Sequence, residues 1–271
     1  MSNPVSNTET NRYFIGSLAK GLELLGAFSN SSQPLSLKDL TERTGWNKGA
    51  AFRYAFTLQQ LGYLHQDPIT KRYRPGVKVL SLGFAYLSGL GLTERAQSYL
   101  EELFQETGQP AHLAILDGSD IVYVSRRADR RLTSINVYVG ARLPAYCTSM
   151  GKVLLAYLPR EEARRRLASA PLTQHTPNTI TNLDRLEAEL ERIRRQGYSS
   201  TDQELELGAR SIAAPIRDAS GEVIAAVNVS TLVVRVTREE LFERFLPRLL
   251  SAANGISSVL GYIPGAQELA V

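Results

Sequence analysis

The chain has little cysteine and histidine, and their scarcity excludes several kinds of site. Its 271 residues hold one cysteine, Cys147, so no disulfide can form within the chain, which agrees with a reducing compartment. The three histidines are scattered and, beside a single cysteine, show no metal-ligand spacing. We therefore predict no metal site and no cofactor.

Long apolar runs are also absent. The longest falls far short of the roughly 20 residues that a membrane-spanning helix needs. Residues 1–12 are polar and lack the apolar centre of a signal peptide. We therefore expect a cytoplasmic protein that has no membrane partner.

The sequence also lacks the common catalytic motifs. Ser149 lies in Thr-Ser-Met-Gly, without the first glycine of a G-x-S-x-G nucleophile turn. His112 and His175 have no evident partner, and no G-x-x-x-x-G-K-[ST] phosphate loop is present. We predict that the chain is not an enzyme.

Positive charge is concentrated in the first part of the chain. Residues 1–75 hold nine Lys and Arg against five Asp and Glu, whereas the remainder holds 22 of each, so the net charge of +4 lies in the first part. A segment that neutralises DNA phosphates needs such an excess. The length favours two domains. We expect a flexible tail at 1–13, a DNA-binding domain at 14–76, a linker helix at 77–91, an effector-binding domain at 92–262 and a tail at 263–271.

Residues 35–73 have the pattern of a helix-turn-helix. Ser36 and Asp39 have the spacing of a capping box, Gly45 ends the first helix, and Asn47 can cap the second. In the second helix, apolar residues recur at helical spacing at Ala51, Tyr54, Ala55, Leu58 and Leu61.

A basic hairpin follows, in which Tyr63–Gln66 and Arg72–Tyr73 pair across residues 67–70, so the motif is a winged helix-turn-helix. Small residues in the first turn of the second helix let it enter the major groove. Lys48 and Arg53 are the best candidates for base edges or phosphates. The predicted DNA-binding residues are Asn47, Lys48, Gly49, Ala50, Arg53 and Thr57 on the helix, and Lys71, Arg72 and Arg74 on the wing. Alternatively, the motif only packs a small helical domain and the basic residues form a solvated face.

Two further helices flank this motif. Phe14–Phe28 is predicted to pack against it through Leu18, Leu22 and Leu25. Val77–Leu90 is apolar nearly all round and must be buried on several sides. We interpret it as a linker helix covered by a second copy of the chain; the alternative is a core helix of the second domain.

The second domain alternates strands and helices. Paired strands flanked by helices predict an α+β domain with a mainly antiparallel sheet. A strong hairpin signal at Asp117-Gly118 joins two of the strands. The predicted strands are 111–116, 121–126, 134–139, 198–202, 211–217 and 222–230, and the predicted helices are 93–106, 149–158, 160–168, 183–196 and 238–260.

Two stretches, "TSMGKVLLA" (148–156) and "GARSIAAPIRDASGEVIAAVNVS" (208–230), carry a resemblance to the IclR family of bacterial transcription regulators. The resemblance covers about residues 14–262. "VYVSRRADRR" followed by "VGARLPAYCTSMGK" resembles the branch that controls aromatic-acid catabolism. It implies a winged helix-turn-helix joined to a GAF-like effector domain. It also implies homodimers, often paired into tetramers, bound to a palindromic operator in double-stranded DNA.

The resemblance places the effector pocket at Thr148, Ser149, Met150, Gly151, Thr201, Ser211, Asn228 and Ser230. The start of the helix near Gly151 would offer backbone N–H groups to an anion. Asn228 and Ser230 share a strand face, although a polar strand residue can equally be satisfied within the sheet. Family members that bind small keto acids carry an acidic residue, a cysteine and a serine where this chain has Thr201, Ser211 and Asn228, which favours a different carboxylate.

Together these patterns predict a sequence-specific transcriptional regulator controlled by a small organic acid. The expected effector is aromatic, such as 4-hydroxybenzoate or protocatechuate, or a product of the same pathways such as β-ketoadipate. The alternative is a small-molecule-binding or catalytic α+β protein whose N-terminal helices only dimerise. Steep salt dependence of DNA binding would separate the two.

Overall fold

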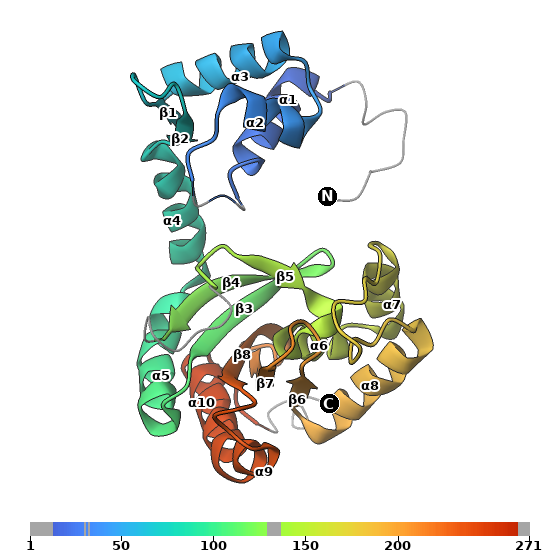
Figure 1. Cartoon of the computed structure of the whole chain (residues 1–271). Helices are drawn as coiled ribbons and strands as arrows, with labels where there is room; N and C mark the ends of the chain where they lie inside the picture. Colours follow the sequence, from blue (N-terminus) through green and yellow to red (C-terminus); the bar gives the residue numbers. More distant parts are fainter. Residues whose placement is uncertain (1–12, 30, 32, 129–136, 265–271) are drawn as a thin grey trace. The chain divides into compact units, whose positions relative to one another are not determined.

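The computed structural model describes residues 13–29, 31, 33–128 and 137–264, and the chain divides into compact units at residues 1–89 and 90–271 (Figure 1). The predicted tails at 1–13 and 263–271 lie almost entirely outside the described residues. None of the described helices has the length and apolarity needed to cross a membrane.

The first unit is a winged helix-turn-helix followed by one more helix. The predicted caps form: the Ser36 hydroxyl accepts from the Asp39 N–H at 3.2 Å, the Asp39 carboxylate accepts from the Ser36 N–H at 2.7 Å, and Gly45 ends α2 in the left-handed conformation. The elements are α1 (Gly16–Gly26), α2 (Leu37–Thr44), α3 (Lys48–Gln60), β1 (Leu64–Gln66), β2 (Tyr73–Pro75) and α4 (Lys78–Leu90).

The small core of this unit contradicts part of the predicted packing. Leu24, at 0% exposure, lies in the core together with Leu40, whereas Leu18 and Leu22 are about 60% exposed. Helix α1 carries apolar residues on two sides, and only one side can face a core of three short helices. Leu61, predicted to face inward from the end of α3, is also exposed.

The wing pairs slightly later than predicted, with His65 opposite Arg74 and Gln66 opposite Tyr73. Asp67 holds the turn, because its Oδ1 accepts hydrogen bonds from the N–H groups of Ile69 and Thr70 at 3.0 and 2.7 Å. These bonds also lower the pKa of the Asp67 carboxyl. Hydrogen bonds within the turn therefore stabilise the conformation of the wing tip.

Helix α4 exposes large apolar side chains within the single chain. Leu80, Leu82 and Phe84 are each more than half exposed. A soluble chain rarely leaves such a continuous apolar surface uncovered. Among the described residues, nothing covers these side chains.

The second unit confirms the predicted α+β class. The six strands among its described residues form one antiparallel sheet in the order β5-β4-β3-β8-β7-β6. The strands are β3 (Ala111–Asp117), β4 (Asp120–Arg127), β5 (Arg142–Pro144), β6 (Ser199–Asp202), β7 (Ala209–Arg217) and β8 (Val223–Leu232). The helices are α5 (Leu92–Thr107), the 3-10 turn η2 (Ala145–Cys147), α6 (Ser149–Ala156), α7 (Arg160–Ala168), α8 (Leu183–Gln196), α9 (Arg238–Glu240), the π turn η3 (Leu241–Phe245) and α10 (Leu246–Val259).

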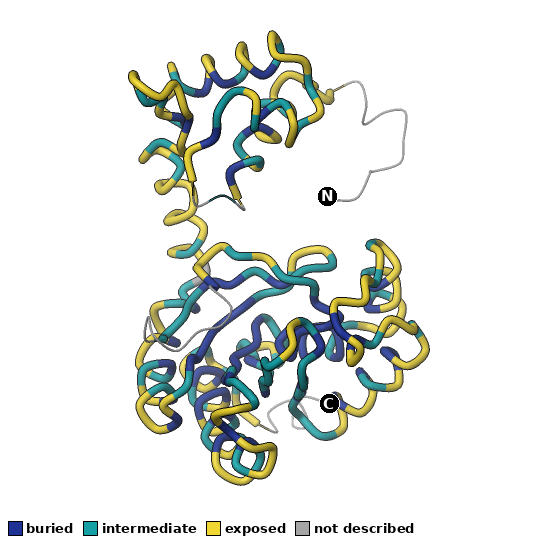
Figure 2. Tube along the Cα trace, in the orientation of Figure 1, coloured by how far each residue is buried: buried dark blue, intermediate teal, exposed yellow. Residues whose placement is uncertain are grey.

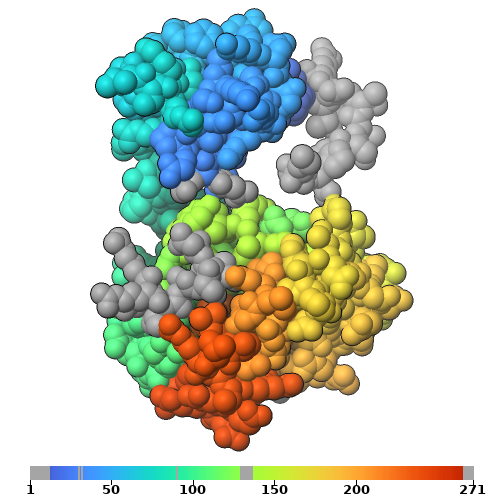
Figure 3. All heavy atoms as spheres, viewed as in Figure 1, coloured from blue at the N-terminus to red at the C-terminus, as the bar shows by residue number. Residues whose placement is uncertain are grey.

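The two faces of the sheet carry different helices. Helices α5 and α10 pack on one face, and α6 packs on the other, between the sheet and α8 (Figure 1). Small residues at Ala114, Ala213 and Ala226 face α6, which lets this helix approach the strands closely. Every residue of α6 is buried (Figure 2). Helices α7 and α8 lie next to each other on the surface (Figure 3).

Two predicted elements differ from the structure. Of the predicted strand at 134–139, residues 134–136 lie outside the described residues and Val137–Val139 do not form a strand. The edge of β4 is instead paired by β5, whose Leu143 lies opposite Ile121. The final helix is interrupted by η3, because Pro247, at the start of α10, has no N–H to donate to the preceding turn.

Candidate functional site

Helix α3 presents most of its predicted DNA-binding side chains outward. Lys48, Gly49, Arg53 and Thr57 are exposed. Asn47 is also exposed, and its Oδ1 accepts the Ala50 N–H at 2.9 Å, so it caps the helix. Ala50 is partly buried.

Two aromatic residues that the sequence reasoning missed share this surface. Phe52 and Phe56 are 48% and 50% exposed, with ring centroids 6.1 Å apart. Both fall outside the buried stripe that contains Ala51 and Leu58. Their spacing from that stripe could therefore have predicted that they face outward. The outward face of α3 is therefore apolar as well as basic.

The three predicted wing residues have different surroundings. Lys71 and Arg74 are exposed. Arg72 donates to the Pro34 carbonyl at 2.9 Å and pairs with the Asp39 carboxylate at 3.3 Å. The pKa of Asp39 is lowered, first by its hydrogen bonds with Ser36 and then by Arg72. Arg72 thus ties the wing to the start of α2.

A cavity lies between the α6 side of the sheet, the start of α6 and the loop after β6. Its volume is about 70 Å³, counted as the space open to the centre of a water molecule. One water needs at least about 10–15 Å³ of such space, so the cavity is large enough to admit a small molecule. Seven of the eight predicted ligand residues line it: Thr148, Ser149, Met150, Thr201, Ser211, Asn228 and Ser230.

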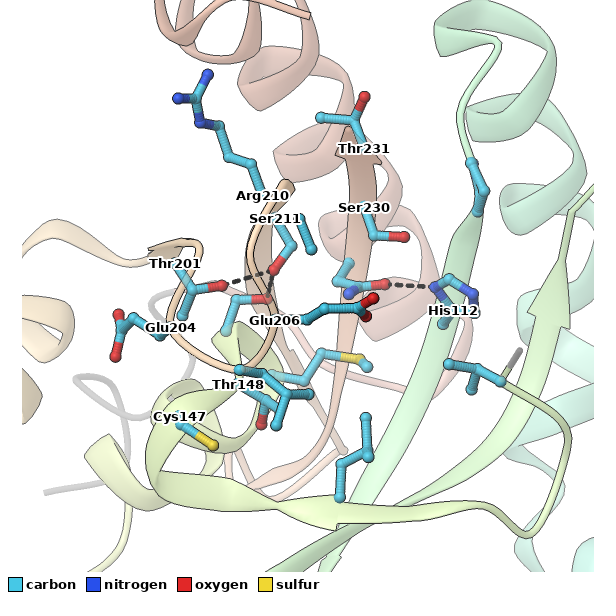
Figure 4. A pocket seen from close by; sticks show the side chains of 18 of the residues that line it. His112, Cys147, Thr148, Thr201, Glu204, Glu206, Arg210, Ser211, Ser230 and Thr231 are labelled. Carbon is cyan, nitrogen blue, oxygen red and sulfur yellow. Dashed lines mark hydrogen bonds between the residues drawn. The ribbon is translucent and has the colours of Figure 1, made fainter. Parts of the chain in front are cut away.

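Three hydroxyl groups form a chain along one wall of this cavity. The Ser211 Oγ lies 2.8 Å from the Ser149 Oγ and 2.8 Å from the Thr201 Oγ1 (Figure 4). The strand register brings the strand residues together, because Thr201 on β6 lies opposite Ser211 on β7, which lies opposite Ser230 on β8. Ser149 reaches them from the start of α6. Hydroxyl groups can turn their hydrogens toward a bound carboxylate.

The start of α6 supplies further donors to the same wall. Thr148 caps the helix, and its Oγ1 accepts the Gly151 N–H at 3.3 Å. The N–H groups of Ser149 and Met150 have no partner within the helix. A carboxylate there would also meet the positive end of the helix dipole.

Gly151, the eighth predicted residue, does not line the cavity. Its N–H is already used by the cap, and a Cβ at this position would collide with the backbone of Ala145. Glycine at this position therefore lets η2 pack against α6 rather than providing a ligand contact.

Charged groups surround the cavity but are mostly paired. Lys152 is fully buried, and its Nζ lies 2.5 Å from the Glu204 Oε1. Burial raises the pKa of Glu204, although the Lys152 ammonium acts in the opposite direction. Arg210 pairs with Asp202 at 2.9 Å. Glu206 is an exposed member of the lining.

His112 is a buried lining residue that the sequence reasoning left without a partner. Its Nδ1 lies 2.9 Å from the Asn228 Oδ1 (Figure 4), and its ring meets the Tyr123 ring edge-on at 5.5 Å. Burial lowers the pKa of His112 to about 4; the Asn228 bond opposes this effect and Arg126 adds to it. The imidazole is therefore neutral at pH 7.

No group of three or more His, Cys, Asp or Glu side chains in the described ranges could hold a metal ion. Cys147 is buried, which raises the pKa of its thiol to about 12. A thiol that stays protonated at neutral pH is a poor nucleophile.

A winged helix-turn-helix joined to a domain with a small cavity, lined by hydroxyl groups and apolar side chains, defines the class of ligand-responsive DNA-binding regulators. Two family models match the chain: "IclR helix-turn-helix domain" over residues 17–68 and "Bacterial transcriptional regulator IclR C-terminal" over residues 84–258. The chain belongs to the IclR family of bacterial transcriptional regulators. This membership confirms the predicted family and favours a regulator over the alternative of a protein that only dimerises through its first helices.

Three similar proteins illustrate the relationship. The Pca regulon regulatory protein of Pseudomonas putida is 45% identical over 244 residues, which cover 90% of this chain and 83% of that protein. The p-hydroxybenzoate hydroxylase transcriptional activator of Acinetobacter baylyi is 36% identical, with 91% and 92% covered. The crystal structure of an IclR homolog from Microbacterium hydrocarbonoxydans, complexed with 4-hydroxybenzoate, has a TM-score of 0.78 and 27% identity, with 90% and 98% covered.

Proposed function

We propose that this regulator controls an operon for aromatic-acid catabolism and that an aromatic carboxylic acid is its effector. The observation that carries the proposal is the chain of Ser149, Ser211 and Thr201 hydroxyls beside the start of α6, in a cavity large enough to admit a small molecule. The names of the Pseudomonas and Acinetobacter relatives and the 4-hydroxybenzoate complex of the homolog support the same class of effector.

The carboxylate is proposed to bind where neutral donors converge. The hydroxyls of Ser149, Ser211 and Thr201 and the N–H groups at the start of α6 can all donate to it, with Asn228 and Ser230 on the adjoining strand. Hydrogen bonds to a charged acceptor are stronger than neutral ones, which offsets the desolvation of the acid. Catalysis is not part of the proposal, because the buried Cys147 thiol stays protonated and the Ser149 hydroxyl meets the Ser211 hydroxyl rather than a base.

A thermal-shift panel of benzoate, 4-hydroxybenzoate, protocatechuate and β-ketoadipate tests the effector class, because a ligand that binds only the folded chain raises its melting temperature. The Ser211→Ala variant should bind the active acid about 10-fold more weakly, since it loses a charge-assisted hydrogen bond. Ser169→Ala, whose hydroxyl donates to Arg166 on α7, is the matched control. If none of the three aromatic acids shifts the melting temperature, the proposal is wrong, even if β-ketoadipate does.

DNA binding is proposed for the nine predicted residues of α3 and the wing, with 14–76 as the DNA-binding domain, 77–91 as the linker helix and 92–262 as the effector domain. The proposed location is the cytoplasm, where bacterial operators lie.

Of the wing residues, Lys71 and Arg74 are proposed to contact DNA phosphates. A gel-shift titration should show that Arg74→Ala weakens binding evenly across operator sequences and reduces the salt slope by about one. An unchanged salt slope would exclude Arg74 from phosphate contact.

A homodimer, itself able to pair into a tetramer, is proposed from the apolar surfaces that the single chain leaves exposed. Leu80 and Phe84 on α4, with Leu18 and Leu22 on α1, would be covered by a second copy. Two recognition helices must sit about one DNA turn apart on a palindrome. An effector that binds one dimer arrangement better shifts the population toward it.

Sedimentation should show a dimer for the natural chain and a monomer for Leu80→Glu. A natural chain that sediments as a monomer refutes the proposed dimer.

A further inference from the structure

The wall of the cavity opposite the hydroxyl chain holds a buried polar atom with no partner. His112 is 3% exposed, and among the described residues its Nε2 has no hydrogen-bond partner. Buried polar atoms in native proteins are nearly always hydrogen-bonded, so an exception that lines a ligand cavity indicates a contact that the ligand completes. The chemical character of this atom then restricts the ligand.

The character of the Nε2 atom follows from its neighbour. The Nδ1 of His112 faces the Asn228 Oδ1, which can only accept, so the Nδ1 carries the hydrogen. The imidazole is neutral, because burial lowers its pKa to about 4. In a neutral ring with hydrogen on Nδ1, the Nε2 is an acceptor. The partner it lacks is therefore a hydrogen-bond donor.

The strand register sets the separation of the backbone positions that carry this acceptor and the hydroxyl chain. His112 on β3 lies opposite Asn228 on β8, which lies opposite Ala213 on β7, two residues along from Ser211. With strands about 4.8 Å apart and about 3.4 Å per residue, the Cα atoms of His112 and Ser211 are about 12 Å apart. The two side chains extend from the same face of the sheet, and a benzene ring with polar groups at opposite positions is of a length to lie between them. Figure 4 shows His112 on one side of the cavity and Thr201 with Ser211 on the other.

We propose that His112 is a specificity-determining residue, and that its Nε2 accepts a hydrogen bond from a hydroxyl group on the ring of the effector, opposite the carboxylate. The inference rests on the proposed function and narrows it from aromatic acids to hydroxylated aromatic acids. Asn228 holds the imidazole in the accepting tautomer. An acid without the hydroxyl leaves the Nε2 buried and unpaired, and this penalty produces the discrimination.

Calorimetric titration of the full chain with four acids tests the requirement for a donor. The natural chain should bind 4-hydroxybenzoate about 10- to 100-fold more tightly than benzoate, and 3-hydroxybenzoate, whose hydroxyl is not opposite the carboxylate, more weakly than 4-hydroxybenzoate. It should bind 4-methoxybenzoate, which has the oxygen but cannot donate, no more tightly than benzoate. Equal affinities for hydroxylated and plain benzoate would overturn the inference and leave the proposed function standing, whereas failure to bind any of the acids would overturn both.

Two variants separate a recognition role from a structural one. His112→Phe keeps a ring beside Tyr123 but has no acceptor, so it should lose the preference for the hydroxyl and bind 4-hydroxybenzoate and benzoate with similar affinity. His175→Phe, on the other histidine of this unit and outside this cavity, should keep the preference. A preference that survives in His112→Phe would overturn the inference.

Nitrogen NMR of histidine-labelled natural protein gives a readout that does not depend on how well a variant folds. The His112 Nε2 should show the chemical shift of an unprotonated ring nitrogen without ligand and should move when a hydroxybenzoate binds but not when benzoate binds. A hydrogen on the Nε2 in the free protein would overturn the inference.

Discussion

Acid should destabilise the second unit through His112. Burial is the main reason that the pKa of this imidazole is lowered from 6.5 to about 4. Between these values the unfolded chain binds a proton at this residue and the folded chain does not. The free energy of unfolding therefore falls as the pH falls, and the contribution is complete above about pH 6.5 and is lost by about pH 4.

The size of the effect follows from the shift. Each pKa unit corresponds to about 1.4 kcal/mol. At pH 7.5 the imidazole is neutral in both the folded and the unfolded chain, so it does not reduce the free energy of unfolding. The reduction in the free energy of unfolding reaches about 2 kcal/mol at pH 5 and about 3 kcal/mol at pH 4. With a denaturant slope of about 2 kcal/mol per molar urea, the midpoint should fall by about 1 M between pH 7.5 and pH 5 on account of this residue.

Urea denaturation of the natural chain and of His112→Phe, each at both pH values, isolates this contribution. Far-UV circular dichroism follows both units, whereas fluorescence of Trp46, the only tryptophan in the sequence, reports the first unit alone. The variant cannot bind the proton, so its midpoint should fall about 1 M less than that of the natural chain. Glu204 and the other carboxyl groups titrate in both proteins and cancel in the comparison.

The reasoning is refuted if both proteins lose the same stability between pH 7.5 and pH 5. That result would mean that the folded His112 takes up its proton as easily as the unfolded chain does. A difference confined to the Trp46 transition would also refute it, because His112 belongs to the other unit.

Four further predictions concern the DNA surface and the core. Arg53→Ala should weaken operator binding by about 1–3 kcal/mol in gel shifts if the guanidinium contacts a base, and unchanged affinity would exclude that contact. Phe56→Ala should make binding insensitive to replacing operator thymine by deoxyuridine, because the exposed ring would pack on thymine methyl groups; continued sensitivity would exclude this role. Lys152→Met should cost about 3–5 kcal/mol by leaving Glu204 buried and unpaired, and adding Glu204→Leu should restore most of it; a further loss would show that the pair is not the cause. Gly151→Ala should cost about 1–3 kcal/mol through its collision with η2, and an unchanged melting temperature would show that η2 can yield.

Features set by neighbours in the sequence could be predicted. The caps at Ser36 and Asn47 depend on residues three positions away, so the helix-turn-helix and its limits followed from the residue pattern. The antiparallel sheet likewise followed from the hairpin turns between strands. The family's motifs added the positions of Ser149 and Ser211, which the structure brings to 2.8 Å of each other.

Features set by distant contacts could not be predicted. His112 meets Asn228 across 116 residues, so the sequence held no signal that would pair them. The prediction that Leu18 on α1 faces inward was wrong. Leu18 and Leu24 are equally apolar, and only the tertiary arrangement decides which of them is buried. Nothing near Lys152 in the sequence shows that its ammonium group ends inside the domain, beside a carboxylate 52 residues away.

The bond between Arg72 and the start of α2 limits how this regulator can respond to its effector. Arg72 and the backbone pairing of Leu35 with Tyr73 join the wing to the helix-turn-helix, so a movement of the wing alone would break these contacts. We therefore expect the recognition helix and the wing to move together when the effector binds. For the proposed dimer, an added or missing base pair between the half-sites should then weaken binding more than a change within one half-site.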